Sequence, residues 1–315
     1  MRATTISLDA PAHLFALSPD GGALAVVHPA ALTVIDLASA AVRARGVVGG
    51  VVYACAFTPD GASVILGTRT PTVFDLAAGE TSKAAFKGPQ SAPNAVDFSA
   101  DGATAYFACG SFMAAHDCAL YAFDVATRAP RWARSLADED GNTDLAILGG
   151  RAVVFGELGA ARLIDLASGA VHATAQVVPA APYGESLLRG ARVDDGAVVA
   201  STLEAQAPVL KRIDLRDKEM HVRWGAPLLS PDAEKPDAAV AGRPFVAGAR
   251  AYVPVLVSAG GAVRVELVGV ELETGAVCAR IPLAGCQSHL AVLCAGDTLV
   301  WSSGERALSI GSLAG

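Results

Sequence analysis

The sequence has 315 residues, of which 52% are hydrophobic and 17% charged, with a formal net charge of −7. This composition excludes an intrinsically disordered chain, which would be poor in apolar residues and rich in charge. Nucleic-acid binding is not expected, because Lys and Arg form no basic stripe that would neutralise phosphates. No apolar run approaches the roughly 20 residues of a membrane-spanning helix, so no membrane association is expected either.

The chain begins with a short β-prone segment, Ala3–Leu8. It has neither the apolar core nor the small-residue cleavage site of a secretory signal, so we expect a cytoplasmic protein. The first repeat of the chain starts only after it, near His13. The segment is therefore a strand without a partner in its own part of the sequence.

One pattern then recurs along the chain: an apolar strand that ends in an acidic residue, followed by an apolar residue and a turn of small residues. The acidic positions are Asp36, Asp75, Asp124, Asp165, Asp214 and Glu271, and a seventh copy, Leu308–Gly311, has no acid. Intervals of 39–57 residues suit four short strands per repeat, as in the blades of a β-propeller. We interpret the acids as turn residues that accept backbone N–H bonds.

Tight turns keep pace with this pattern. Strong turn sequences occur at Ser18–Gly21, Thr58–Gly61, Ser99–Gly102 and Val193–Gly196. They combine Pro, Asp and Gly, which preset or tolerate turn geometry. Because such turns break every apolar run before 10–12 residues, helices are not expected.

We therefore predict an all-β fold, a single seven-bladed β-propeller with four-stranded antiparallel blades. The expected blades are residues 9–48, 49–88, 89–138, 139–180, 181–230, 231–284, and 285–315 with 1–8. The last repeat supplies only three strands, near His289–Cys294, Thr298–Ser302 and Ala307–Leu313. Since an unpaired sheet edge is an aggregation hazard, we expect Ala3–Leu8 to complete this blade and close the ring.

Two features carry a resemblance to known proteins. Residues Ala119–Thr127, followed by Trp132, resemble a quinoprotein-type repeat, and the Ser/Thr-Pro-Asp-Gly turns resemble those of YVTN-type propellers. Over essentially its whole length the chain resembles the WD-repeat and quinoprotein-like bacterial β-propeller superfamily, which implies the propeller fold. The chain lacks the Trp-Asp and Gly-His dipeptides of WD repeats and the vicinal Cys pair of quinoprotein dehydrogenases. We expect no cofactor.

The resemblance also implies where a site would lie, because the innermost strands of such propellers start together at the top face. Aligned strand starts are polar: His13, Tyr53, Asn94, Asp144, Glu185 or Ser186, Arg243 and His289. Loops between second and third strands add Arg69, Phe112 and His116. Phe112 is either an exposed apolar side chain of the kind found at interfaces or packs on the channel mouth. The insertion Pro227–Pro244 is expected to lie over the same face. The simpler interpretation is that strand starts are polar because water reaches them.

The cysteines leave three alternatives open around Cys109, His116 and Cys118. They are a zinc site, a disulfide between the two cysteines, or small buried side chains. We favour the last, because structural zinc needs a fourth ligand and disulfides are rare in a reducing cytoplasm. No metal site is predicted.

Our functional prediction is a non-catalytic scaffold that binds a partner protein through this top-face rim, with no catalytic residues. One alternative is a channel-site enzyme such as a metal-dependent lactonase or hydrolase. In it Asn94, Asp144 and Glu185 would hold a divalent cation, and His13 and His289 would act as base or ligands. The other alternative is a small-ligand sensor that uses the same pocket. The oligomeric state is left open.

Overall fold

The computed structural model describes residues 3–83, 93–110, 118–136, 141–180, 186–230, 238–286, 288, 292–304 and 306–313. Within these ranges there are strands and turns but no helices, and the strands form seven antiparallel sheets. In the described part of the chain no helix is long and apolar enough to cross a membrane. The predicted class, all-β with seven β-propeller blades, is confirmed. The chain divides into two compact units, Met1–Glu139 with Leu293–Gly315, and Asp140–Val292.

The first unit contains four blades. Blade one is β2 (Leu14–Leu17), β3 (Ala23–Val27), β4 (Ala31–Asp36) and β5 (Val42–Val47). Blade two is β6 (Ala54–Phe57), β7 (Ser63–Gly67), β8 (Thr72–Asp75) and β9 (Glu80–Lys83). Blade three is β10 (Pro93–Phe98), β11 (Thr104–Cys109), β12 (Ala119–Asp124) and β13 (Pro130–Ser135).

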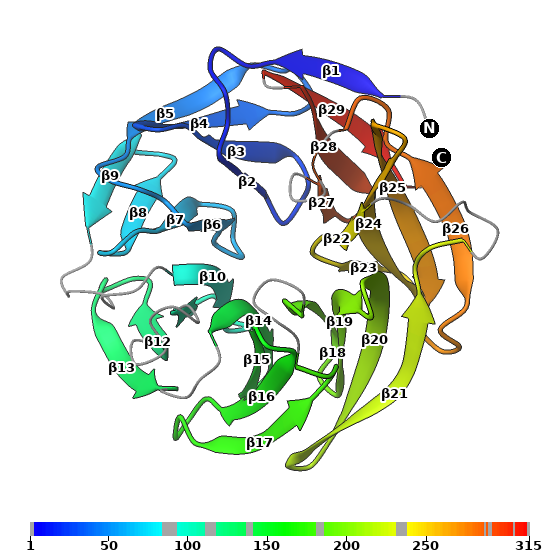
Figure 1. The fold of residues 1–315 in the computed structure, drawn as a ribbon. Coiled ribbons are helices and arrows are strands. Elements are labelled where there is room, and N and C mark those ends of the chain that lie inside the picture. The colour runs from blue at the N-terminus through cyan, green and yellow to red at the C-terminus, as the bar shows by residue number, and fades with distance from the viewer. Residues whose placement is uncertain are drawn as a thin grey trace. The chain divides into compact units, whose positions relative to one another are not determined.

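Blade seven joins the two ends of the chain. It is built from β27 (Val292–Ala295), β28 (Thr298–Gly304), β29 (Ala307–Ser312) and β1 (Thr4–Ser7). Strand β1 pairs antiparallel with β29, from Thr4 opposite Ile310 to Ser7 opposite Ala307, and Figure 1 shows the two side by side. The prediction that the N-terminal strand completes the last blade is confirmed.

The second unit contains three blades. Blade four is β14 (Asn142–Leu148), β15 (Arg151–Gly156), β16 (Ala160–Asp165) and β17 (Val171–Gln176). Blade five is β18 (Arg189–Asp194), β19 (Ala197–Glu204), β20 (Ala207–Arg216) and β21 (Glu219–Pro227). Blade six is β22 (Ala238–Ala241), β23 (Phe245–Ala247), β24 (Arg250–Ala259), β25 (Ala262–Glu271) and β26 (Val277–Pro282).

Blade six differs from the sequence prediction. Residues 227–244 were expected to be an inserted loop, but Ala238–Ala241 form β22, with Ala239 and Ala241 buried. Strands β22 and β23 both pair with β24, so they are two halves of one interrupted innermost strand. Residues 231–237, which lie outside the described residues, contain Pro and Asp. Because these residues are typical of loops, the sequence predicted one long insertion.

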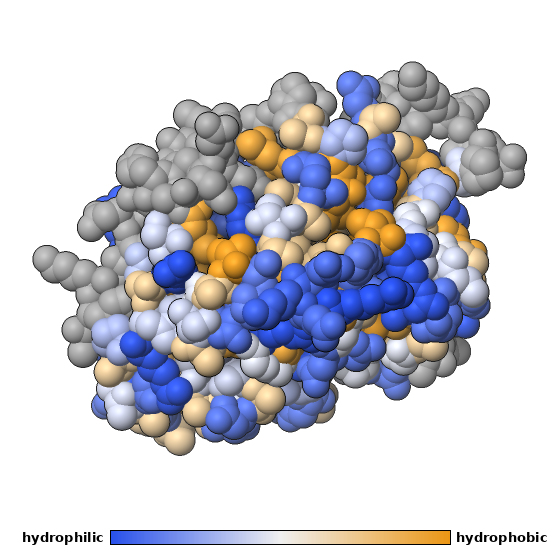
Figure 2. Space-filling model, turned by 90° about the horizontal axis from the view of Figure 1, so that it is seen from below, coloured by the Kyte–Doolittle hydropathy of each residue, from blue (hydrophilic) through white to orange (hydrophobic). Residues whose placement is uncertain are grey.

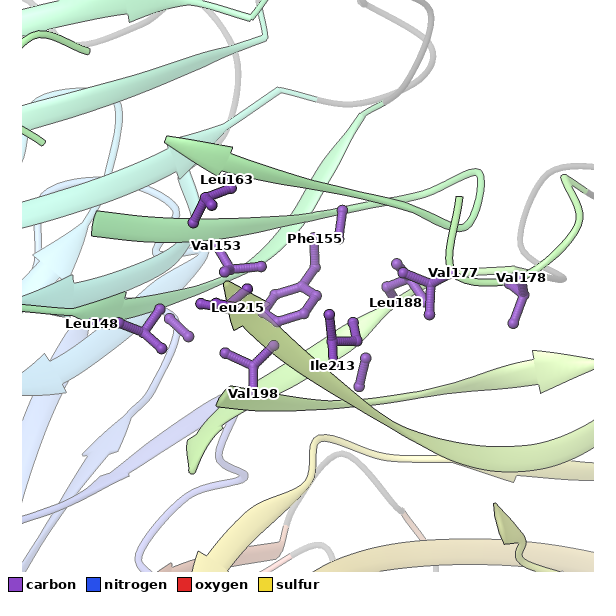
Figure 3. Close-up of a cluster of buried hydrophobic side chains, with 13 residues drawn as sticks. Leu148, Val153, Phe155, Leu163, Val177, Val178, Leu188, Val198, Ile213 and Leu215 are labelled. Carbon is purple, nitrogen blue, oxygen red and sulfur yellow. The ribbon is translucent and has the colours of Figure 1, made fainter. Parts of the chain in front are cut away.

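The core is built in slices between neighbouring blades. In Figure 3, Phe155 from β15 lies among side chains of blade five that include Val198 and Ile213. Further clusters join blades one and two, two and three, five and six, and seven and one. This arrangement explains how a chain longer than the usual limit of roughly 250–300 residues for one core still buries its apolar residues.

Exposure increases from the middle of each blade to its outermost strand. All five residues of β3 are buried, whereas the outermost strands β5 and β17 alternate between exposed and partly buried residues. Strands β17 and β21 lie at the lower rim of Figure 1. Figure 2, seen from below, shows a surface rich in hydrophilic residues. Half-buried antiparallel strands alternate in this way when one face meets water.

The recurring acids are turn residues, as predicted. The carboxylate of Asp36 accepts bonds from the Ser39 N–H (2.9 Å) and hydroxyl (2.7 Å), and Asp165 binds Ser168 in the same way. The exception is Asp214, which pairs with Arg212 at 2.9 Å. Blade five has longer strands, so its acid lies inside the β20–β21 ladder rather than at a turn.

Asp124 is expected to make stability depend on pH. The Thr127 N–H, the Arg131 guanidinium and the Thr127 hydroxyl lower the pKa of Asp124 to about 2, below its ordinary 3.8. The contribution of the ionised Asp124 to stability is therefore fully present above about pH 4 and is lost as the pH falls through about 2. We expect Asp124→Asn to lower the urea midpoint at pH 7 and to have a much smaller effect at pH 2. Parallel pH profiles of the two proteins would contradict this.

Candidate functional site

Four predicted rim residues lie in the first unit, at the end of the blades where the innermost strands begin. His13 and Tyr53 immediately precede β2 and β6, and both side chains are exposed. Their backbone N–H groups donate to Val27 O and Gly67 O, each at 2.9 Å. Asn94 is the second residue of β10, and its Nδ2 donates to Gly110 O at 2.6 Å. Arg69 is exposed between β7 and β8.

The remaining predicted positions divide into two groups. Phe112, His116, Glu185 and His289 lie outside the described residues. Asp144 and Arg243 are in the second unit, and the structure brings them together: Arg243 Nη2 lies 2.9 Å from Asp144 Oδ1. This ion pair connects blade four with blade six.

Two β-bulges place these side chains. In β14, Asn142 pairs with Gly156 and Asp144 with Phe155, so one residue of β14 is extra. In blade six, Ala241 pairs with Val255 and Phe245 with Tyr252, so three residues including Arg243 face two. Bulges re-aim side chains from the normal alternation of a strand.

Blade five lies between these two blades, and Asp144 and the Arg243 segment also bond to it. Asp144 Oδ2 accepts the Gly190 N–H at 3.0 Å, and Asp144 Oδ1 accepts the Leu145 N–H at 2.9 Å. Arg243 Nε donates to Gly190 O at 3.4 Å, and the Ser201 hydroxyl donates to Gly242 O at 2.6 Å. The side chain of Asp144 is only 4% exposed, whereas that of Arg243 is 50% exposed. The bonds of Asp144, Gly190 and Arg243 thus link three consecutive blades.

Sequence reasoning missed one residue of this group, Arg189. It is the first residue of β18, immediately before Gly190. Burial lowers the pKa of the Arg189 guanidinium, while the negative charge of Asp144 opposes that effect and the positive charge of Arg243 adds to it. Comparison of the repeats of this chain with one another placed the start of blade five near Glu185. Counting back from the turn at Asp194–Gly196 by the length of a six-residue strand would have found Arg189.

The chemistry of the group follows from its bonds. Both oxygens of Asp144 accept donors, one of them a cation, so this carboxylate is not poised as a base or as a metal ligand. The guanidinium groups are the available functional groups. Among the described residues, no cluster of three or more His, Cys, Asp and Glu side chains could hold a metal ion.

Two of the cysteines singled out in the sequence lie in the described part of blade three. Cys109 and Cys118 are both buried, at 0% and 1% exposure. Burial, with a smaller effect of Cys118, raises the pKa of the Cys109 thiol well above its ordinary 9.0. Burial of this kind is typical of thiols that pack as small apolar side chains.

A second surface feature lies in the first unit, between β5 and β6. Val47, the last residue of β5, is 76% exposed, and Val51 and Tyr53 in the following connection are 66% and 40% exposed. Because successive strands of blade two are antiparallel, this segment and the Arg69 loop lie at the same end of that blade. Apolar and aromatic side chains with a neighbouring arginine are typical of the centre of a protein–protein interface.

In a comparison with solved structures, 1508 chains match this one. Hydrazine synthase of Kuenenia stuttgartiensis has a TM-score of 0.73 and 18% sequence identity, over 100% of this chain and 99% of that one. No family model matches the sequence, and no curated protein matches it. At 18% identity the similarity shows the fold alone, a β-propeller shared by proteins of many functions.

Proposed function

We propose that this chain is a non-catalytic scaffold that binds a partner protein through the rim of the first unit, centred on Tyr53. The observation that supports it most is the exposure of Val47, Val51 and Tyr53 in a single segment. Scattered exposed apolar residues are ordinary, but several in one segment beside an arginine mark an interaction site. His13 and Arg69, both exposed nearby, would supply the polar edge of this interface.

We also propose that the chain is related to the WD-repeat and quinoprotein-like propellers of the YVTN type. The support is in its turns, where the hydroxyls of Ser18, Thr58 and Ser99 donate to Asp20, Asp60 and Asp101 at 2.5–2.6 Å. A cytoplasmic location, and a protein rather than a nucleic acid as partner, are part of this proposal. The net charge of −7 supports the choice of partner.

The metal-dependent hydrolase is the weaker alternative, on the evidence of Asp144. A cation held there would have to displace the Arg243 guanidinium, which lies 2.9 Å from Asp144 Oδ1. The incoming cation would have to replace this charge-assisted bond at a carboxylate whose two oxygens already accept backbone N–H groups.

Binding measurements on matched valine variants test the proposed interface. Val51→Ser and Tyr53→Ser are expected to weaken binding of a partner captured from the native cells at least tenfold, about 1.4 kcal/mol each. Val263→Ser is the control, because Val263 is similarly exposed at 50% but lies in the other unit. Equal affinity of all three variants for that partner would exclude this interface. A stoichiometric divalent metal together with lactone hydrolysis would overturn the non-catalytic scaffold.

A further inference from the structure

We propose that Arg189 and Arg243 form a binding site for one carboxylate group at the inner edge of blades five and six. The site is independent of the Tyr53 surface, because it lies in the other compact unit. Its ligand is any molecule that presents a single carboxylate, either a small organic acid or an acidic side chain. Guanidinium groups bind carboxylates through paired, charge-assisted hydrogen bonds.

The Arg243 guanidinium has an N–H donor that no described residue uses. Its Nη2 serves Asp144 at 2.9 Å and approaches Leu145 O at 3.4 Å, and its Nε approaches Gly190 O at 3.4 Å. Its Nη1 has no hydrogen-bond partner among the described residues, and half of the side chain is exposed. Asp144 therefore orients the guanidinium from one side and leaves another edge free for a ligand.

The carboxylate of Asp144 opposes the charge of Arg189, but without a direct bond. In the part of the chain that the structure describes, its guanidinium has neither a hydrogen bond nor an ion pair, although burial is already sufficient to lower its pKa. A partly buried cation without a partner is costly, and a ligand carboxylate would remove that cost. The orientation of its strand is fixed, because the adjacent Gly190 N–H is bonded to Asp144.

The balance of charge selects the ligand. Arg189 and Arg243 carry two positive charges, and Asp144 neutralises one of them. Among the described residues, these three side chains therefore carry an excess of one positive charge, which one carboxylate balances. A phosphate dianion would leave an uncompensated negative charge next to Asp144, so we expect it to bind more weakly than a carboxylate.

The site is tested by NMR of the full chain labelled with 15N-arginine. Acetate is expected to shift the Nε–H signals of Arg189 and Arg243 in a saturable way, whereas sodium chloride at equal ionic strength is not. Arg189→Gln should weaken acetate binding at Arg243 at least tenfold. Arg192→Gln is the matched control on the same strand, since Arg192 already has an ion pair with Asp195 at 3.0 Å, and it should leave acetate binding unchanged.

Two further probes separate the possible ligands. A blocked peptide with one glutamate that binds more tightly than acetate would indicate an acidic side chain, and the reverse order would indicate a small organic acid. Inorganic phosphate binding more tightly than both would overturn the choice of carboxylate. The site itself would be excluded if acetate produced no saturable shift, or if Arg192→Gln and Arg189→Gln weakened binding equally.

Discussion

Deletion of residues 1–8 is expected to lower the melting temperature by about 10 °C or more. Ile6 and Leu8 are buried in the cluster between blades seven and one, at 5% and 8% exposure. Burial of two such side chains contributes roughly 3–6 kcal/mol, and each kcal/mol shifts the melting temperature by about 2–4 °C in a domain of this size class. The deletion also removes the ladder between β1 and β29, which leaves β29 as an open edge.

Shorter changes in the same strand isolate the cause. Deletion of residues 1–3 keeps β1 and is expected to leave the melting temperature nearly unchanged. Within the strand, Ile6→Ala should cost roughly 2–5 kcal/mol, whereas Thr5→Ala, at an exposed position, should cost well under 1 kcal/mol. Calorimetry and urea unfolding measure both. If deletion of residues 1–8 left the melting curve unchanged, β1 would not be closing blade seven in solution.

The fold could be predicted because its signals are local and repeated. In most copies the acid ends a strand and accepts bonds within three residues, as Asp36 does from Ser39, so a few adjacent residues determine the turn. Asp214 is the exception. Strand β1 was predictable because the last repeat has only three strands, and the N-terminal segment has no partner in the first repeat. Blade six was read incorrectly, because Pro and Asp in residues 231–237 conceal the start of the innermost strand at Ala238.

The candidate site was predictable only in part. Polar strand starts identified Asp144 and Arg243, but nothing in their sequence neighbourhoods indicates that they pair across blade five. That contact depends on two bulges, whose register is set by the partner strands β15 and β24. Arg189 was missed for a related reason: the strand start was placed by alignment with other blades, and β18 begins after a longer connection.

Gly190 is where this site and the core meet, and Gly190→Ala is expected to be strongly destabilising. A Cβ atom there would lie 2.0 Å from Cζ and 2.1 Å from Cε2 of Phe155. The ring cannot yield easily, because it is fully buried among blade four and blade five side chains. Overpacking of this kind costs about 1–3 kcal/mol and more where backbone must shift. Here a shift would also disturb the bonds of Gly190 to Asp144 and Arg243.

A double-mutant cycle shows whether the clash is the cause. Phe155→Ala alone should cost roughly 3–5 kcal/mol through the cavity it leaves, and Gly190→Ala added to it should cost almost nothing further. Gly150→Ala is the matched control, because a Cβ atom at Gly150 would meet nothing within 4 Å. Additive costs in the cycle would show that Gly190 is required for its backbone alone. A strong coupling with Phe155, together with loss of the acetate response in Gly190→Ala, would show that core packing between blades four and five holds the arginine site in register.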